Sequence, residues 1–272
     1  MSGSARGAVP AAPRAYAAWR FMPVSASPWR RDGNGLGSRP GVPRRLEWSA
    51  ATAAEEATDL SMRTVTIIET GLVAPQLRER HGTYPRMFER MMRQAGVEAD
   101  FRTVCVSEGE ALPDPARLDA VLITGSPAGV YDDLPWIAPL EAFIRDGYAA
   151  STPMAGICFG HQVMAQALGG VVRKSERGWG LGRHVYEVPP AARTILASEF
   201  SPHAGLLYDN GAMISVQPHP EFDLDYALAC CGIIEARAPA AVIAAARDSL
   251  RHPLDSQSLG RAIARFLLPD EG

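Results

Sequence analysis

The sequence has no uninterrupted run of about 18 apolar residues, the length that indicates a membrane-spanning helix. It has little cysteine: four residues, none in a Cys-x-x-Cys pair, and its six histidines are scattered. This argues against a structural zinc site. The net charge is only −3, so no excess of one sign indicates nucleic acid or an anionic membrane as a partner. These absences favour a protein of the reducing cytosol that needs no metal or other cofactor.

The first 61 residues differ in composition from the rest of the chain. They are rich in Ala, Arg, Gly, Pro and Ser, and residues 1–46 contain eight arginines but a single acid, Asp32. Such a segment buries little apolar area per residue, so we expect residues 1–61 to be a disordered extension and residues 62–272 to form one domain. Three interpretations of the extension remain: a dispensable or mis-assigned start, a targeting segment, and a partner-binding tail.

One segment, Gly156-Ile157-Cys158-Phe159-Gly160-His161-Gln162, combines a cysteine with the signals of a strand that turns sharply into a helix. A short apolar stretch precedes it, and apolar residues at helical spacing follow it. A strained corner needs small neighbours, and a glycine stands two positions on either side of Cys158. The corner would present the thiol at the positive end of the helix, where the thiolate is favoured. The pattern predicts that Cys158 is a nucleophile.

A histidine and a carboxylate follow a second apolar run, residues 213–216. His219 and Glu221 lie in the segment Gln-Pro-His-Pro-Glu-Phe, whose two prolines stiffen the chain. Residues two apart in an extended chain point to the same side. His219 could therefore act as the base for Cys158, with Glu221 orienting the imidazole. A histidine alone is more often a surface or core residue, and only its pairing with the cysteine corner favours the catalytic interpretation.

Together these motifs resemble those of the class I (triad-type) glutamine amidotransferases. The resemblance is closest to stand-alone members related to the glutaminase part of GMP synthase. The buried run 120–123 leads into Thr124-Gly125-Ser126-Pro127, where the family has Gly-Gly-Pro or Gly-Ser-Pro. The stretches 64–71 and 174–180 also look like this subgroup.

The resemblance implies a γ-glutamyl amide as the substrate and a thioester as the intermediate. Cys158 would attack the amide, His219 would transfer the protons, and Glu221 would hold the imidazole tautomer. Because the chain has no synthetase domain, the ammonia would pass to a separate synthetase partner, or the enzyme would simply be a hydrolase.

The same resemblance implies a set of groups around the substrate. The backbone amide of Phe159 and one amide from the Gly125-Ser126 turn would bind the oxyanion of the tetrahedral intermediate. Gln162 would help to hold the substrate, or it would serve only as a structural amide.

The chain departs from the family between Val188 and Pro189, where relatives have a further strand–turn–strand that shapes the glutamine pocket. The separation of Cys158 from His219, 219 − 158 = 61 residues, is correspondingly short. Two alternatives to a glutaminase therefore stay open. One is a γ-glutamyl peptidase that acts on glutathione-like compounds, and the other is a catalytically silent binding or regulatory homologue.

Strand and helix signals alternate from residue 62 onward. This predicts an α/β fold, and with the resemblance a flavodoxin-like, largely parallel sheet with helices on both faces and the site at the carboxyl ends of its strands. Asp132 and Asp133 are expected to cap a helix that begins near Leu134, and His161 to pack or hydrogen-bond locally. The expected strands span 65–68, 99–106, 120–123, 151–155, 205–208 and 213–216, and the expected helices span 84–95, 134–148, 163–168 and 226–236.

Overall fold

The computed structural model describes residues 24–25, 62–172, 178–182, 184 and 194–269. The predictions about a disordered extension and about the shortened segment near residues 188–189 concern residues outside these ranges. The resemblance over 174–177 also lies outside them. Within the described ranges, no helix combines the length and apolar character that crossing a bilayer requires.

A seven-stranded sheet in the order β3-β2-β4-β5-β9-β8-β7 forms the centre of the fold. Its first five strands run parallel: β3 (Asp100–Cys105), β2 (Thr64–Glu69), β4 (Ala120–Ile123), β5 (Met154–Ile157) and β9 (Met213–Val216). The antiparallel strands β8 (Gly205–Leu207) and β7 (Thr194–Leu196) complete one edge. A separate antiparallel pair joins β1 (Val24–Ser25) to β6 (Val171–Val172). The predicted flavodoxin-like α/β sheet is confirmed.

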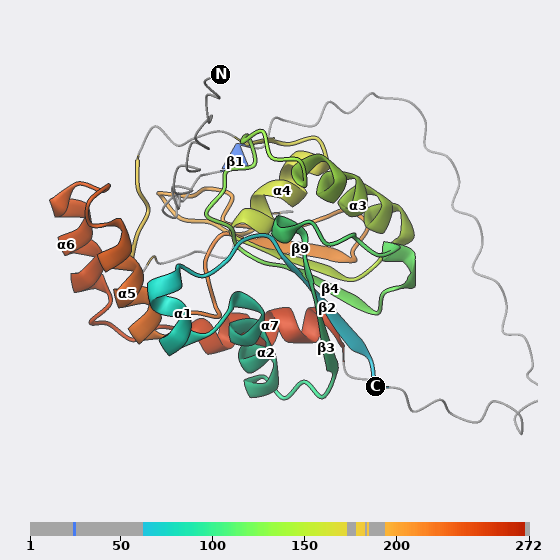
Figure 1. Ribbon diagram of the computed structural model, residues 1–272, viewed down its shortest axis with the longest axis horizontal. Coiled ribbons are helices and arrows are strands. Elements are labelled where there is room, and N and C mark those ends of the chain that lie inside the picture. Colours follow the sequence, from blue (N-terminus) through green and yellow to red (C-terminus); the bar gives the residue numbers. More distant parts are fainter. Residues whose placement is uncertain (1–23, 26–61, 173–177, 183, 185–193, 270–272) are drawn as a thin grey trace, which may run out of the picture.

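Helices cover both faces of this sheet (Figure 1). Helices α3 (Ile137–Ala150) and α4 (Phe159–Ala167) lie on one face, and α2 (Tyr84–Gln94) and α7 (Ser256–Leu267) lie on the other. Helices α5 (Leu224–Ile234) and α6 (Ala240–Ser249) stand together at one end of the molecule. The short helix α1 (Pro75–His81) follows β2, and two 3-10 turns span Val106–Glu108 and Pro115–Arg117.

The sheet divides the apolar side chains into two main cores. In β4 every residue is buried, yet Leu122 packs in the core beneath α2 and α7, while Val121 and Ile123 pack beneath α3 and α4. This alternation follows from the two-residue period of a strand. A central strand that is covered on both faces therefore appears in the sequence as a continuous apolar run.

The start of α3 differs from the prediction. The helix begins at Ile137, and its N-cap residue Trp136 makes no side-chain capping hydrogen bond. The carboxylate of Asp132 instead accepts a hydrogen bond from the Gly129 amide at 2.8 Å. The expectation that Asp132 and Asp133 cap this helix is therefore wrong, because the acidic pair lies in the turn before the helix.

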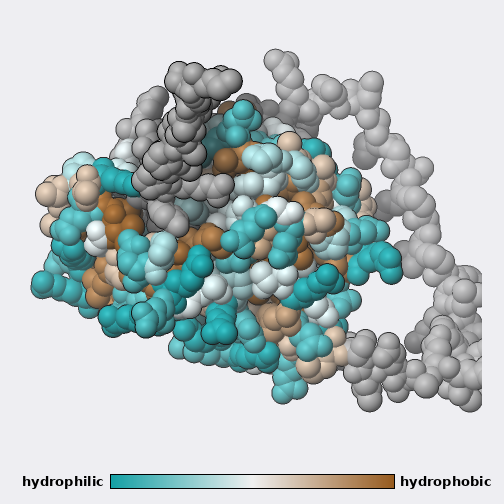
Figure 2. All heavy atoms as spheres, viewed as in Figure 1, coloured by the Kyte–Doolittle hydropathy of each residue, from teal (hydrophilic) through white to brown (hydrophobic). Residues whose placement is uncertain are grey.

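Apolar residues also reach the surface at the α5–α6 end of the molecule. Figure 2 shows hydrophobic side chains gathered over these helices on the face in view. Among the described residues, Leu224 and Leu228 of α5 are exposed large hydrophobic side chains. Single exposed leucines are common on protein surfaces and do not by themselves mark an interface.

Candidate active site

The chain turns from β5 into α4 at Cys158. This residue has φ 54° and ψ −100°, which is a left-handed backbone conformation for a residue with a side chain. Such a conformation costs on the order of 1–3 kcal/mol and persists only where its surroundings impose it. The Cys158 amide donates to the Val216 carbonyl at 2.9 Å, which ties the corner to β9. The predicted strained corner is thus present, and its thiol stands at the N-terminus of α4.

The two glycines beside the corner are required by close packing. A Cβ at Gly160 would collide with the Ile123 carbonyl oxygen of β4. A Cβ at Gly156 would lie 2.6 Å from the carbonyl carbon and oxygen of Gly160. Backbone atoms cannot give way as a flexible side chain can. The expectation that both neighbours of Cys158 must be small is confirmed.

His219 and Glu221 lie in the loop that follows β9. The Nδ1 of His219 and the Oε1 of Glu221 are 2.7 Å apart, and the two side chains are 5% and 0% exposed. Burial disfavours the charged imidazole, but the Glu221 carboxylate and the Cys158 sulfur outweigh it and raise the pKa of His219 to about 10. The influence of Cys158 on this pKa means that the sulfur lies within interaction range of the ring.

The structure thus brings Cys158 close to the His219–Glu221 pair, which lies about 60 residues further along the chain. Parallel neighbours β5 and β9 end at the same edge of the sheet, so the corner after β5 and the loop after β9 meet there. This arrangement can deliver a sulfur nucleophile and a proton to one reacting group.

The turn after β4 lies next to the cysteine corner. The Gly160 amide donates to the Thr124 carbonyl at 3.1 Å, which fixes the start of α4 against this turn. Phe159 is the first residue of α4, and the amides of a first helical turn have no acceptor within their helix. The expected oxyanion donors, Phe159 and the Gly125-Ser126 turn, therefore come from adjacent segments.

The Gly125-Ser126 turn is held by Thr70, the residue that follows β2. The hydroxyl of Ser126 donates to the Thr70 carbonyl at 2.7 Å and accepts from the Ala128 amide at 3.1 Å. The hydroxyl of Thr70 contacts the Gly125 carbonyl at 3.1 Å. The side chain of Ser126 thus stabilises the turn. Any contact of this turn with a substrate would therefore come from its backbone.

Gln162 points into the protein. Its side-chain amide donates to the Gln217 side-chain oxygen at 3.2 Å, and both residues are buried. This bond ties α4 to the segment that leads to His219. Gln217 was not identified from the sequence as a site residue, although it stands directly before the Pro-His-Pro-Glu segment. Only its hydrogen bond with Gln162 of α4 reveals its place beside the site.

His161 lies behind the cysteine corner and is fully buried. Its Nδ1 is 2.7 Å from the Ser215 hydroxyl, which also lies 3.0 Å from the Tyr208 hydroxyl. Burial lowers the pKa of His161 to about 4. The expectation that this histidine bonds locally is confirmed, and it stays neutral at neutral pH.

Acidification is expected to destabilise the protein through His161. The pKa of His161 in the folded protein, about 4, lies below its ordinary value of 6.5. The stability that neutral His161 contributes is therefore complete above pH 6.5 and is lost as the pH falls from 6.5 to about 4. The loss amounts to about 3 kcal/mol of unfolding free energy at pH 4. Urea unfolding at several pH values should show that the free energy of unfolding falls less on acidification in His161→Gln than in the natural chain. If the free energy of unfolding depended on pH equally in the two proteins, buried neutral His161 would not be the cause of the acid destabilisation.

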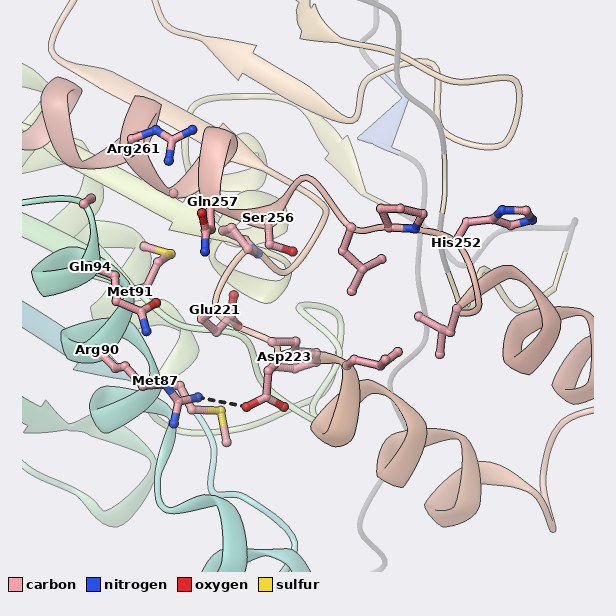
Figure 3. Close-up of a pocket in the computed structure, with 18 of the residues that line it drawn as sticks. Met87, Arg90, Met91, Gln94, Glu221, Asp223, His252, Ser256, Gln257 and Arg261 are labelled. Carbon is pink, nitrogen blue, oxygen red and sulfur yellow. Dashed lines mark hydrogen bonds and ion pairs between the residues drawn. The ribbon is translucent and has the colours of Figure 1, made fainter.

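A cavity of about 650 Å³ lies behind the His219 loop, between α2, α7 and the segment that joins α6 to α7 (Figure 3). Glu221 and Phe222 form part of its wall, and Arg90 lies 3.4 Å from the Asp223 carboxylate at its edge. Neither Cys158 nor His219 lines it. This cavity is therefore distinct from the side on which a substrate would meet the sulfur.

No metal site accompanies these groups in the described part of the chain. Among those residues, no three or more His, Cys, Asp or Glu side chains gather in a way that could hold a metal ion. The reactive groups that the corner and the loop bring together are a sulfur, an imidazole and a carboxylate.

Comparisons with known proteins agree with the fold and the motifs. The family model described as Glutamine amidotransferase class-I matches residues 79–188, a range that includes Cys158 and ends before His219. The glutamine amidotransferase-like protein chry6 of Gibberella zeae is 28% identical over 200 residues, which cover 64% of this chain and 82% of that protein. A subunit of the glutamine-hydrolyzing GMP synthase of Ignicoccus hospitalis is 29% identical over 166 residues, or 52% of this chain and 84% of the relative.

A solved structure supports the same conclusion for the fold. The glutamine amido transferase from Methylobacillus flagellatus superposes with a TM-score of 0.57 over 76% of this chain and 95% of that one, at 22% identity. At this identity the likeness concerns the fold alone. The resemblance predicted from the motifs is confirmed: residues 79–188 match the class I glutamine amidotransferase model, and the chain has the fold of this solved structure.

Proposed function

We propose that this protein hydrolyses a γ-glutamyl amide, glutamine in the first instance, to glutamate and ammonia through a thioester on Cys158. The observation that carries the proposal is the meeting of the strained Cys158 corner with the buried His219–Glu221 pair, whose ring nitrogen and carboxylate oxygen are 2.7 Å apart. Nucleophile, base and orienting group then have the arrangement of covalent acyl transfer.

The first half of the reaction forms the thioester. With His219 protonated at neutral pH, the Cys158 thiolate attacks the side-chain carbonyl carbon, and the carbonyl electrons move onto oxygen. The amides of Phe159 and the Gly125-Ser126 turn would hold this oxyanion. As the carbon–nitrogen bond breaks, the imidazolium gives its proton to the nitrogen and ammonia leaves.

The second half returns the enzyme to its starting state. Neutral His219 takes a proton from a water molecule, whose oxygen attacks the thioester carbonyl. The carbon–sulfur bond breaks, glutamate leaves, and the thiolate–imidazolium pair is restored. Glu221 keeps the Nδ1 proton in place through both halves, so that the other ring nitrogen faces the reaction.

The substrate and the partner follow from the same proposal. Gln162 would contribute to the substrate side of α4, either directly or by holding Gln217. The ammonia would be used by a separate synthetase that associates with this chain. The reaction needs a reduced thiol, which fits the cytosol as the compartment.

Mass spectrometry of the intact protein tests the proposal. The protein is incubated with glutamine or a γ-glutamyl peptide, quenched in acid, and digested to find the acylated residue. We expect one γ-glutamyl group on Cys158, with ammonia released from glutamine in parallel. The His219→Gln variant, which cannot supply the proton to the leaving nitrogen, should accumulate little acyl-enzyme.

The outcomes separate the alternatives. If γ-glutamyl peptides acylate Cys158 but glutamine releases no ammonia, the protein is a γ-glutamyl peptidase that uses the same thioester, and the glutaminase proposal is wrong. No acylation by either donor, in a folded protein whose Cys158 also resists a glutamine-analogue affinity label, would overturn the catalytic proposal and leave a silent homologue.

A further inference from the structure

An aromatic ring lies flat against His219. The rings of Phe222 and His219 have centroids 4.2 Å apart and an interplanar angle of 9°. Both residues belong to the short segment after β9, where Pro220 and Glu221 separate them. A parallel contact at this distance covers one whole face of the imidazole. That face is therefore closed to water and to substrate, and the ring can rock only by displacing Phe222.

Phe222 is itself held by aromatic side chains from two helices. Tyr226 of α5 meets it edge-on, with centroids 4.5 Å apart and planes at 73°. Tyr84, at the start of α2, lies 6.5 Å away with its plane at 21°. The two tyrosine hydroxyls are joined by a hydrogen bond of 3.2 Å, and both residues are 2% exposed. Edge-to-face and offset contacts of this kind are the favoured geometries of aromatic pairs.

We propose that Phe222 is a positioning residue for His219, holding the imidazole in the plane that serves both Glu221 and Cys158 and favouring its protonated form. The inference rests on the proposed function only in taking His219 as the base. The hydrogen bond to Glu221 fixes one edge of the ring but permits rotation about that bond, and the flat contact with Phe222 removes this freedom. The negative face of an aromatic ring also attracts a cation placed over it.

The surroundings of His219 leave few other groups to set its charge. Cys158 from the β5–α4 corner and Glu221 from its own loop act on His219 directly. The titratable groups that interact with Glu221 from the packed helices are Tyr84 of α2 and Tyr226 and Cys230 of α5. Burial raises the pKa of both tyrosines well above 10 and that of Cys230 to about 12. The phenols and this thiol are therefore neutral, and the charge on His219 depends on Cys158, Glu221 and the ring face.

Phe222→Leu tests the inference, because leucine fills similar space without a flat, electron-rich face. In protein with ¹⁵N-labelled histidine, we expect the NMR titration midpoint of His219 to fall by about one pH unit. The kcat for γ-glutamyl hydrolysis should fall by about tenfold or more, with KM changed by less than about threefold, because the loss concerns proton transfer. Phe222→Tyr, which retains the aromatic face, should keep the His219 midpoint near its natural value and kcat within about twofold of the natural value.

Phe266→Leu on α7 is the matched control, since Phe266 is a partly buried phenylalanine that packs against the same core. It should leave the His219 midpoint unchanged. Phe222→Met takes the place of the leucine variant if that protein does not fold. A Phe222→Leu or Phe222→Met protein with the natural midpoint and kcat overturns the inference. If no γ-glutamyl donor is turned over, the proposed function fails while the NMR titration still decides the role of Phe222.

Discussion

Replacing Cys158 with alanine is expected to lower kcat for γ-glutamyl hydrolysis by about 10⁴- to 10⁶-fold, because no other group can form the thioester. The loss should appear in kcat and in kcat/KM alike, since the covalent bond exists only beyond the Michaelis complex. Steady-state ammonia release, together with the absence of acyl-enzyme in the mass spectrum, measures it. We expect the strained backbone of residue 158 to persist in the variant, because it belongs to the β5–α4 corner.

Cys231→Ala is the matched control for this experiment. Cys231 is buried in α5, where it packs with Ala246 and Leu250 in a small separate cluster. Its loss should leave kcat within about twofold and cost only the small free energy of a trimmed apolar side chain. A Cys158→Ala protein that keeps more than about a tenth of the natural activity would rule out the thioester route.

Gly160→Ala is expected to destabilise the folded protein by about 3 kcal/mol or more. The new methyl group would meet the Ile123 carbonyl oxygen and also lie 3.2 Å from the Ile123 Cβ. Relief requires α4 to move away from β4, and this movement would separate the Phe159 amide from the Gly125-Ser126 turn. Activity at a temperature where the variant is still folded should therefore fall as well.

The same substitution in α5 provides a control of opposite sign. Beyond its own helix backbone and its chain neighbours, no atom of the described residues lies within 4 Å of a Cβ built at Gly232. Gly232→Ala should therefore stabilise the protein by about 0.5–1 kcal/mol through helix propensity. Urea unfolding of both variants measures the contrast. Similar unfolding midpoints for the two alanine proteins would show that the packing of α4 against β4 does not set the shape of the corner.

Much of the fold could be predicted because its signals are local. Strands such as β4 and β9 are short, fully buried apolar runs, and the two glycines around Cys158 reflect contacts that only a missing side chain permits. Helix α2 is predicted by one apolar face, which is the face that packs on the sheet. In each case the pattern and the final environment agree.

Elements without such a signal escape prediction or are misplaced by it. Helix α1 has no buried residue, so its sequence shows no apolar stripe. The expected start of α3 is three residues too early, because the Asp132-Asp133 pair resembles a helix cap. The carboxylate of Asp132 closes the preceding turn on Gly129 instead. Turn and cap use the same acidic side chains, and only the surrounding chain decides between them.

The sequence by itself determined which residue types stand at the corner and after β9, and their spacing indicated both the class of fold and a sulfur nucleophile. Only the tertiary structure decided how these groups behave. The raised pKa of His219 and the lowered pKa of His161 depend on burial and on neighbours from other strands and loops. The stacking of Phe222 depends on helices α2 and α5, which begin 224 − 84 = 140 residues apart in the sequence and meet at one ring. Solvation and long-range contacts of this kind have no local pattern along a chain.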